Sequence, residues 1–204
     1  MNNNFEAIVF DLGNVLMPFD YRSIVNQLND IYPLLGNRFL DFYRDNYEIH
    51  RSFEKGHLTI EEFTGMVLKA LDNKLDSETF WKIYSQIFTV NTTLVDLLPK
   101  FKAHYKLVLL SNTNEIHRKY GWGDLKFLKY FDRLVLSYEI GAVKPEPEIY
   151  EAVEQFTCAP PHKHLYFDDI PEYVDAARKR GWDGVQFVTN ELLEKALEDR
   201  GILL

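Results

Sequence analysis

Short apolar runs recur along the chain and predict strands that are buried on both faces. Five such runs stand out, at residues 6–10, 105–110, 134–137, 165–167 and 184–188. A half-exposed strand alternates apolar and polar residues, whereas a strand covered by helices on both faces is apolar throughout. The runs therefore favour a sheet with both faces covered.

Between the later runs, apolar residues recur at spacings of three and four, which predicts amphipathic helices. These helices are expected at residues 92–102, 145–156, 171–180 and 191–199. Proline stands at or near two of the helix starts, where its missing amide hydrogen costs little. The alternation of strand and helix predicts an α/β fold with a parallel sheet.

The stretch from about residue 20 to residue 89 has helical patterns and no convincing strand. Thr59 and Glu62 have the spacing of a capping box, which marks a helix start. The many aromatic residues of this stretch are expected to form a core between helices rather than a cofactor site. Helices are expected at residues 29–46, 59–72 and 77–88, and the predicted division is a core of residues 1–18 and 91–204 with a helical insertion of residues 19–90.

The composition is that of a globular protein with an acidic surface. Apolar residues make up 46% of the chain, which is enough to form a core. The formal net charge is -8 and no basic cluster is present, so a nucleic-acid partner is not expected. The overall negative charge repels anionic ligands, so an anionic substrate would need a local cation such as a metal ion or a well-placed lysine.

The cysteine content and the apolar runs bear on the compartment. Cys158 is the only cysteine, so neither an intramolecular disulfide nor a cysteine metal cluster is expected. The first residues lack the pattern of a secretory signal, and no run approaches the roughly 18 apolar residues of a membrane span. We expect a cytoplasmic protein with no membrane partner.

Acidic residues follow two of the predicted strands. Asp11 comes directly after the run at 6–10, and Asp168 and Asp169 close the run at 165–167. Open α/β sheets bind ligands at the carboxyl ends of their strands, although a lone aspartate there is more often a turn or cap residue. Adjacent carboxylates repel each other unless a cation lies between them, and oxygen ligands favour Mg²⁺.

Ser111, Asn112 and Lys144 add groups that suit phosphate. Ser111 and Asn112 end the run at 105–110, where a hydroxyl and main-chain amides can hold phosphate oxygens. Lys144 precedes a proline in a constrained loop, where an ammonium can balance a carboxylate and a phosphate. Each residue alone has an ordinary role in a turn or at the surface, but together they predict one site.

Four segments carry these residues in chain order: VFDLGNVL at 9–16, LSNTN at 110–114, GAVKPE at 141–146 and YFDD at 166–169. With them the chain resembles the haloacid dehalogenase-like superfamily over nearly its whole length. The resemblance implies a doubly wound, Rossmann-like core with a small inserted helical cap, as in subfamily IA. The first two segments and the turn at 54–56 look most like the bacterial branch that contains the alpha-D-glucose-1-phosphate phosphatase.

The resemblance implies a phosphatase that acts on a small phosphate ester, a sugar phosphate above all. Asp11 would attack phosphorus and form an aspartyl-phosphate. Ser111 and the Asn112 amide would hold the phosphoryl oxygens, and Lys144 would balance the charge. A carboxylate that approaches a phosphate dianion needs such neutralisation, which agrees with this assignment.

The resemblance also implies a magnesium site. Asp11, Asp169 and the main-chain carbonyl of Gly13 would bind Mg²⁺, and Asp168 would assist directly or through water. Gly13 is the main departure from the family pattern, because phosphatases of the superfamily usually carry a second aspartate there as general acid and base. Beyond the acidic pair, Glu172 is expected to take over support of the metal.

Residues of the helical insertion are expected to lean over the site as substrate contacts. They are Asp20, His50, Arg51, Glu54 and Lys55. The insertion is expected to close over the core about hinges near residues 19–22 and 90–93.

Two other functions remain open from the sequence. A dehalogenase of the same superfamily also uses an aspartate nucleophile but needs no metal, so the acidic pair Asp168 and Asp169 argues against it. The other alternative is a binding or regulatory protein that has kept the fold without efficient catalysis. Gly13, in place of the usual aspartate, would indicate this loss. The oligomeric state is not indicated by the sequence.

Overall fold

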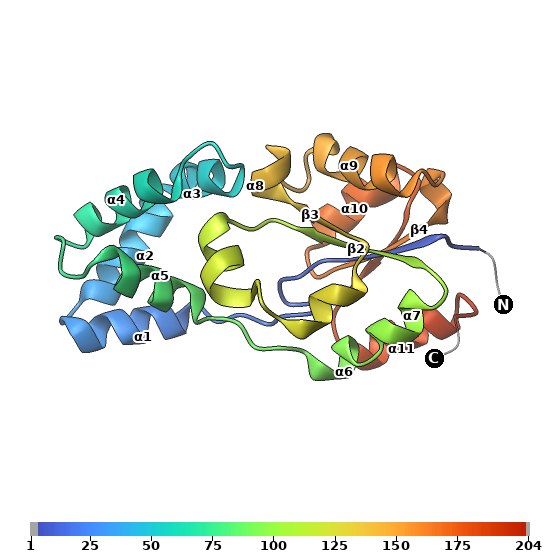
Figure 1. Cartoon of the computed structure of the whole chain (residues 1–204), viewed down its shortest axis with the longest axis horizontal. Helices are drawn as coiled ribbons and strands as arrows, with labels where there is room; N and C mark the ends of the chain where they lie inside the picture. The colour runs from blue at the N-terminus through green and yellow to red at the C-terminus, as the bar shows by residue number, and fades with distance from the viewer. Residues whose placement is uncertain (1–3, 203–204) are drawn as a thin grey trace.

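The computed structural model describes residues 4–202, and its centre is a five-stranded parallel sheet (Figure 1). The strand order is β3-β2-β1-β4-β5, and every neighbouring pair is parallel. Each strand overlaps one of the five apolar runs, so the predicted α/β sheet is confirmed. The strands are β1 (Ala7–Phe10), β2 (Lys106–Ser111), β3 (Arg133–Leu136), β4 (His164–Asp168) and β5 (Asp183–Gln186).

Helices cover both faces of this sheet, as a doubly wound fold requires (Figure 1). One face packs against α9 (Pro147–Thr157) and α10 (Pro171–Lys179). The other face packs against α6 (Thr92–Val95), α7 (Leu98–Lys102) and α11 (Asn190–Glu198). Shorter pieces connect these layers: η1 (His117–Trp122, a π-helix), η2 (Lys126–Tyr130), α8 (Ser137–Ile140) and η3 (Pro161–Lys163).

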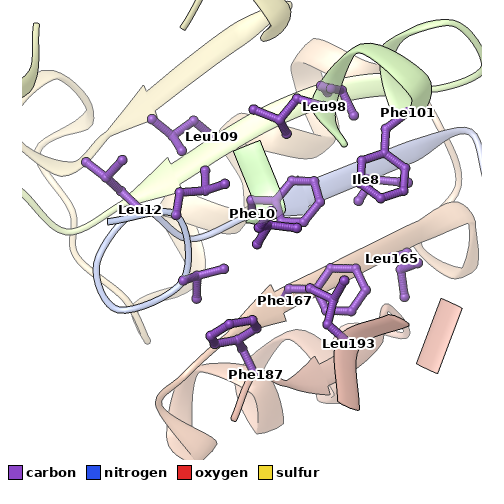
Figure 2. Packing of buried hydrophobic residues seen from close by; sticks show 14 of the residues in the cluster. Ile8, Phe10, Leu12, Leu98, Phe101, Leu109, Leu165, Phe167, Phe187 and Leu193 are labelled. Carbon is purple, nitrogen blue, oxygen red and sulfur yellow. The ribbon is translucent and has the colours of Figure 1, made fainter. Parts of the chain in front are cut away.

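The side chains of β1 alternate between two hydrophobic clusters. Ile8 and Phe10 pack with Leu98 and Phe101 of α7 and Leu193 of α11 (Figure 2). Val9 belongs to the cluster on the opposite face, which includes residues of α9. Phe10 stacks on Phe167 of β4, with 5.4 Å between the ring centroids. Because both faces are buried, β1 reads as an uninterrupted apolar run, and its position at the centre of the sheet is fixed by packing on both sides.

Residues 22–85 form five helices that lie beside the sheet (Figure 1). They share a hydrophobic cluster of their own, in which Phe39, Phe53, Phe63 and Tyr84 are buried, as expected for most of the aromatic residues of this stretch. A complete capping box of Thr59 and Glu62 starts α4, as predicted. The helices are α1 (Arg22–Ile31), α2 (Leu35–Asp45), α3 (Tyr47–Glu54), α4 (Ile60–Ala70) and α5 (Ser77–Ser85).

The two chain crossings between this helical segment and the sheet lie side by side. Asp20 donates its amide hydrogen to the Ile87 carbonyl over 3.0 Å, and Thr89 donates to the Pro18 carbonyl over 2.8 Å. The crossings therefore form one two-stranded connection near the hinges that the sequence predicts. Within residues 4–202, no helix is both long and apolar enough to cross a membrane.

Two predicted helices are wrong in extent because each contains a proline. The helix expected at 29–46 is two helices, α1 and α2, since Pro33 removes a backbone donor and the chain turns through Leu34 with φ 68°. The helix expected at 92–102 is likewise split into α6 and α7, with Pro99 in the first turn of α7. The π-helix and the 3-10 helix between β2 and β3 were not predicted.

Candidate active site

The register of the sheet brings the predicted acidic residues to one edge. Phe10 of β1 pairs with Phe167 of β4, and the Asp11 amide donates to the Phe167 carbonyl over 2.9 Å. Asp11 therefore lies beside Asp168. Ser111 ends β2 on the other side of β1, because Phe10 pairs with Leu109. Three strand ends thus meet at the carboxyl edge of the sheet, as the sequence predicts.

Lys144 is buried between two of these carboxylates. Its Nζ lies 2.6 Å from Oδ1 of Asp11 and 2.6 Å from Oδ2 of Asp168. The main chain of Lys144 is held by Asn112, whose Oδ1 accepts from the Lys144 amide over 2.7 Å and whose Nδ2 donates to the Lys144 carbonyl over 3.1 Å. Asn112 therefore positions the lysine loop through its side chain, a role that the sequence did not indicate.

Both oxygens of Asp168 have protein donors. Oδ2 accepts from Lys144 and from the Tyr166 hydroxyl, and Oδ1 accepts from the Ile170 amide over 2.9 Å. Tyr166 and Asp168 are two residues apart on β4, so their side chains leave the same face of the strand. Asp169 is more accessible and accepts from Asn14 Nδ2 over 3.1 Å. This arrangement suits Asp168 to holding Lys144 and Asp169 to facing a ligand.

The charges of this cluster are not balanced by the protein alone. Asp11, Asp168 and Asp169 each offer an oxygen within 4.8 Å of the others, against the single ammonium of Lys144. Burial raises the pKa of Asp11 to about 8, although Lys144 opposes the shift, and burial also raises the pKa of Asp169. The pKa of Lys144 lies above its usual value, because its two carboxylate partners outweigh its burial. A hard divalent cation among these oxygens would relieve the excess negative charge.

A cavity of about 190 Å³ lies over the acidic cluster. Its floor includes Asp11, Asp169 and Lys144, and the helical segment supplies the opposite wall. The predicted contacts His50, Arg51 and Glu54 line this wall, all from α3. The lining also includes tyrosines that the sequence did not single out as site residues, and these are Tyr21, Tyr43, Tyr47 and Tyr173.

The structure does not bring the other two predicted contacts into the cavity lining. Asp20 is exposed and forms an ion pair with Arg22 at 2.7 Å. Lys55 forms an ion pair with Glu146, the residue before α9. Lys55 therefore ties the helical segment to the core. The predicted metal-supporting residue Glu172 is exposed in the first turn of α10.

Ser111 and Asn112 lie at a second, smaller cavity. Ser111 is 2% exposed, and both residues line a space of about 80 Å³ next to the larger one. Asn112 lines both spaces. The predicted phosphate-holding pair and Lys144 are thus brought to the same strand ends as Asp11.

Gly13 lines both cavities, and an aromatic ring lies close to the position that a Cβ would take there. A Cβ at Gly13 would lie 3.0 Å from Cε1 of Phe19 and 3.7 Å from Oδ2 of Asp11. An added Cβ would require the ring of Phe19 to shift by a few tenths of an ångström. The packing around Gly13 therefore leaves little room at the position where the family pattern usually has an aspartate.

Comparison with known proteins agrees with the fold. Residues 5–181 match the haloacid dehalogenase-like hydrolase family. The chain is 27% identical over 189 residues to a D-ribitol-5-phosphate phosphatase of Bacteroides thetaiotaomicron, covering 88% of this chain and 90% of that protein. It is also 27% identical to a phosphorylated carbohydrates phosphatase of Thermotoga maritima, covering 96% and 91%. A haloacid dehalogenase family enzyme of Bacteroides thetaiotaomicron, solved with magnesium and inorganic phosphate, superposes with a TM-score of 0.77 at 25% identity, covering 91% of this chain and 96% of that one. The chain belongs to the haloacid dehalogenase-like hydrolase family.

Proposed function

We propose that the protein is a magnesium-dependent phosphatase that hydrolyses a small phosphorylated carbohydrate through an aspartyl-phosphate on Asp11. The observation that carries this proposal is the position of Lys144, whose ammonium bridges Asp11 and Asp168 at 2.6 Å each in the floor of the larger cavity. The names of two relatives, both phosphatases of phosphorylated carbohydrates, support the substrate class. The finer placement beside the glucose-1-phosphate phosphatase stays a prediction.

The residues of the acidic cluster fit Mg²⁺. Asp11, Asp169 and the Gly13 carbonyl would hold the ion, because Asp168 already has a donor on each oxygen. The donors are all oxygen, and the cluster carries more negative charge than Lys144 offsets, both of which favour a hard divalent cation. When bound, the ion neutralises the charge of the phosphoryl group as the nucleophile approaches. A solved relative holds magnesium and phosphate.

The side chains of this chain suggest how the reaction proceeds. Lys144 binds Oδ1 of Asp11, so Oδ2 would attack phosphorus, forming the Asp11–phosphorus bond and breaking the bond to the ester oxygen. Ser111 and the Asn112 amide would hold phosphoryl oxygens, while Lys144 offsets their charge. Water would then attack phosphorus, releasing phosphate and restoring the carboxylate.

Proton transfer to the ester oxygen needs another donor than the one usual in the superfamily. Gly13 has no side chain, and the ring of Phe19 lies 3.0 Å from the position that a Cβ would take. The leaving oxygen would take its proton from water or from the polar side chains of α3. The loss of a positioned general acid lowers the rate by roughly a hundred- to ten-thousandfold, which leaves a slow enzyme.

Gly13 is also the observation that favours a second function, a phosphate-binding regulatory protein without turnover. Such a protein would bind Mg²⁺ and phosphate through the same cluster and release no product. A metal-independent dehalogenase is less well supported, because the three clustered carboxylates call for a cation. Only a measurement of turnover distinguishes the phosphatase from the regulatory protein.

The test is phosphate release from a panel of sugar phosphates, polyol phosphates, nucleotides and an aryl phosphate. Each compound is assayed with Mg²⁺ and with a chelator, for the wild type and for Asp11→Asn. Release that needs both Mg²⁺ and Asp11 supports the phosphatase. Mg²⁺ binding without release from any compound would support the regulatory protein, and release that persists in the chelator would overturn the metal requirement.

A further inference from the structure

The two cavities of the site share Glu54 as a lining residue. The larger, of about 190 Å³, is lined by Asp11 and Asp169, and the smaller, of about 80 Å³, extends toward η1. Glu54 lines both, together with Gly13, Phe19, Tyr21 and Asn112. The smaller cavity therefore adjoins the space in which a group attached to a phosphoryl at Asp11 would lie.

Glu54 faces these spaces as an ionised acceptor. Burial acts to raise its pKa, but hydrogen bonds and charges from His50 and Arg51 lower the pKa below its usual value. Oε2 accepts from Arg51 Nη1 over 3.0 Å, and Oε1 lies 3.4 Å from Nε2 of His50. Two carboxylate oxygens have about four acceptor positions, so the carboxylate can accept more than these two bonds.

His117 lines the smaller cavity and carries a buried donor without a partner among the described residues. Its backbone amide donates to Asn114 Oδ1 over 3.0 Å, which fixes the amide group of Asn114, and Asn114 Nδ2 then lies 3.2 Å from Nδ1 of His117. An amide nitrogen only donates, so Nδ1 accepts and the ring proton is on Nε2. Nε2 is buried and has no hydrogen-bond partner among residues 4–202.

We propose, on the basis of the phosphatase function above, that Glu54 and His117 form a subsite for a hydroxyl group of the substrate. The hydroxyl would donate its hydrogen to Glu54 and accept the Nε2 hydrogen of His117. A hydroxyl is the substrate group that does both, whereas a carboxylate accepts only and an ammonium donates only. The smaller cavity has the volume of two or three water molecules at about 30 Å³ each, which is enough for a terminal hydroxymethyl group.

The charge of Glu54 defines the substrate class further. A second phosphate or a carboxylate would be repelled by this carboxylate, because the neighbouring Arg51 is already paired with it. A leaving group without hydroxyls would bury Nε2 of His117 without a partner, which is unfavourable. The subsite thus favours monophosphates of neutral polyols or sugars over bisphosphates and simple aryl phosphates.

The experiment compares a pentitol phosphate, its terminally deoxygenated analogue and an aryl phosphate. Steady-state kinetics with Mg²⁺ are measured for the wild type, Glu54→Gln and His117→Phe, with the exposed residues Glu61→Gln and His57→Phe as matched controls. Binding of the same three compounds to Asp11→Asn, with and without each substitution, is measured by calorimetry. Melting temperatures verify that every variant is folded.

We expect Glu54→Gln to raise the KM for the pentitol phosphate about ten- to a hundredfold and His117→Phe about two- to tenfold, with little change in kcat. The KM for the deoxygenated analogue and for the aryl phosphate should rise much less than the KM for the pentitol phosphate. Equal losses on all three compounds would overturn the subsite in favour of a general structural role. Unchanged KM values on all three would show that water, not substrate, occupies the smaller cavity.

The calorimetry separates this inference from the proposed function. If no compound releases phosphate, the phosphatase proposal fails. The subsite still stands if Asp11→Asn binds the pentitol phosphate more tightly than its analogue and loses that difference with Glu54→Gln. If that difference is absent or survives the substitution, the subsite is wrong whatever the turnover.

Discussion

Arg51 donates a hydrogen bond through Nη2 to the main-chain carbonyl of Lys144, over 3.2 Å. Its Nη1 donates to Glu54 over 3.0 Å, so one guanidinium joins the wall of the cavity to the lysine loop. The contact links α3 to the residue that binds Asp11. The position of the helical segment is thereby connected to the floor of the site.

Arg51→Lys should weaken this link, because a single ammonium cannot reproduce the two-armed geometry of a guanidinium. We expect kcat/KM to fall about tenfold, with the loss of roughly one hydrogen bond to a charged group. Arg44→Lys is the matched control, since Arg44 is exposed on α2 and pairs only with its neighbours Asp41 and Asp45 in the described chain. Similar kinetics for the two variants would show that the Arg51 contact has no part in the reaction.

Gly56 packs closely against the core at a position where only glycine fits. Its φ is +68°, and an added Cβ would lie 2.3 Å from the carbonyl oxygen of Tyr138 in α8. Gly56→Ala should therefore lower the free energy of unfolding by about 1–3 kcal/mol or displace α3 from α8, with loss of activity. Gly65→Ala, in α4 with no atom within 4 Å of the added Cβ, should raise it by about 0.5–1 kcal/mol. Denaturant unfolding measures both, and equal effects would contradict the close contact.

Lys144 is the only cation in contact with the buried carboxylates among the described residues. Lys144→Met should destabilise the metal-free protein by about 3–5 kcal/mol, because it leaves two buried aspartates without their partner. Added Mg²⁺ should recover part of the lost melting temperature in this variant. Lys69→Met, at an exposed position of α4, serves as the control and should change little. If Lys144→Met were as stable as the wild type in the absence of metal, Lys144 would not be needed to offset the charge of the buried aspartates.

The buried His117 should make stability depend on pH. Burial, with the charge of His50, lowers the pKa of His117 to about 3. A histidine in the unfolded chain has a pKa of about 6.5. Between these values the unfolded chain binds more protons, so this contribution to stability is complete above about pH 6.5 and is lost as the pH falls. This histidine alone makes the free energy of unfolding rise with pH by up to about 1.4 kcal/mol per pH unit. The slope for His117→Phe should be smaller by that amount. Urea unfolding at several pH values between about 4 and about 7 measures this pH dependence. An identical slope in His117→Phe would contradict the contribution of His117.

The sheet and the strand-end residues were predictable because they depend on local patterns. Val9 and its neighbours are apolar on both faces, and Asp11 follows them directly, so both the central strand and the edge where its ligand binds can be read from a few residues. Pro33 is an equally local signal and marks the break between α1 and α2, but the prediction of one helix at 29–46 did not take it into account.

The side-chain geometry of the site was not predictable in the same way. Asn112 holds the main chain of Lys144 across 32 residues, and no local pattern indicates such a bond. Tyr166 carried a weak signal, since it is two residues before Asp168 on one strand. The cavity wall depends on how α3 meets the core, so sequence alone did not distinguish Glu54, which lines the cavity, from Lys55, which does not.

The central claim is that Asp11 takes the phosphoryl group from the substrate. Rapid acid quench after mixing the protein with Mg²⁺ and a radiolabelled phosphate ester tests it most directly. The account predicts label that is stable to acid, is released by hydroxylamine and lies on the peptide that contains Asp11, with none in Asp11→Asn. Phosphate release without any labelled protein, or label that persists in Asp11→Asn, would contradict it.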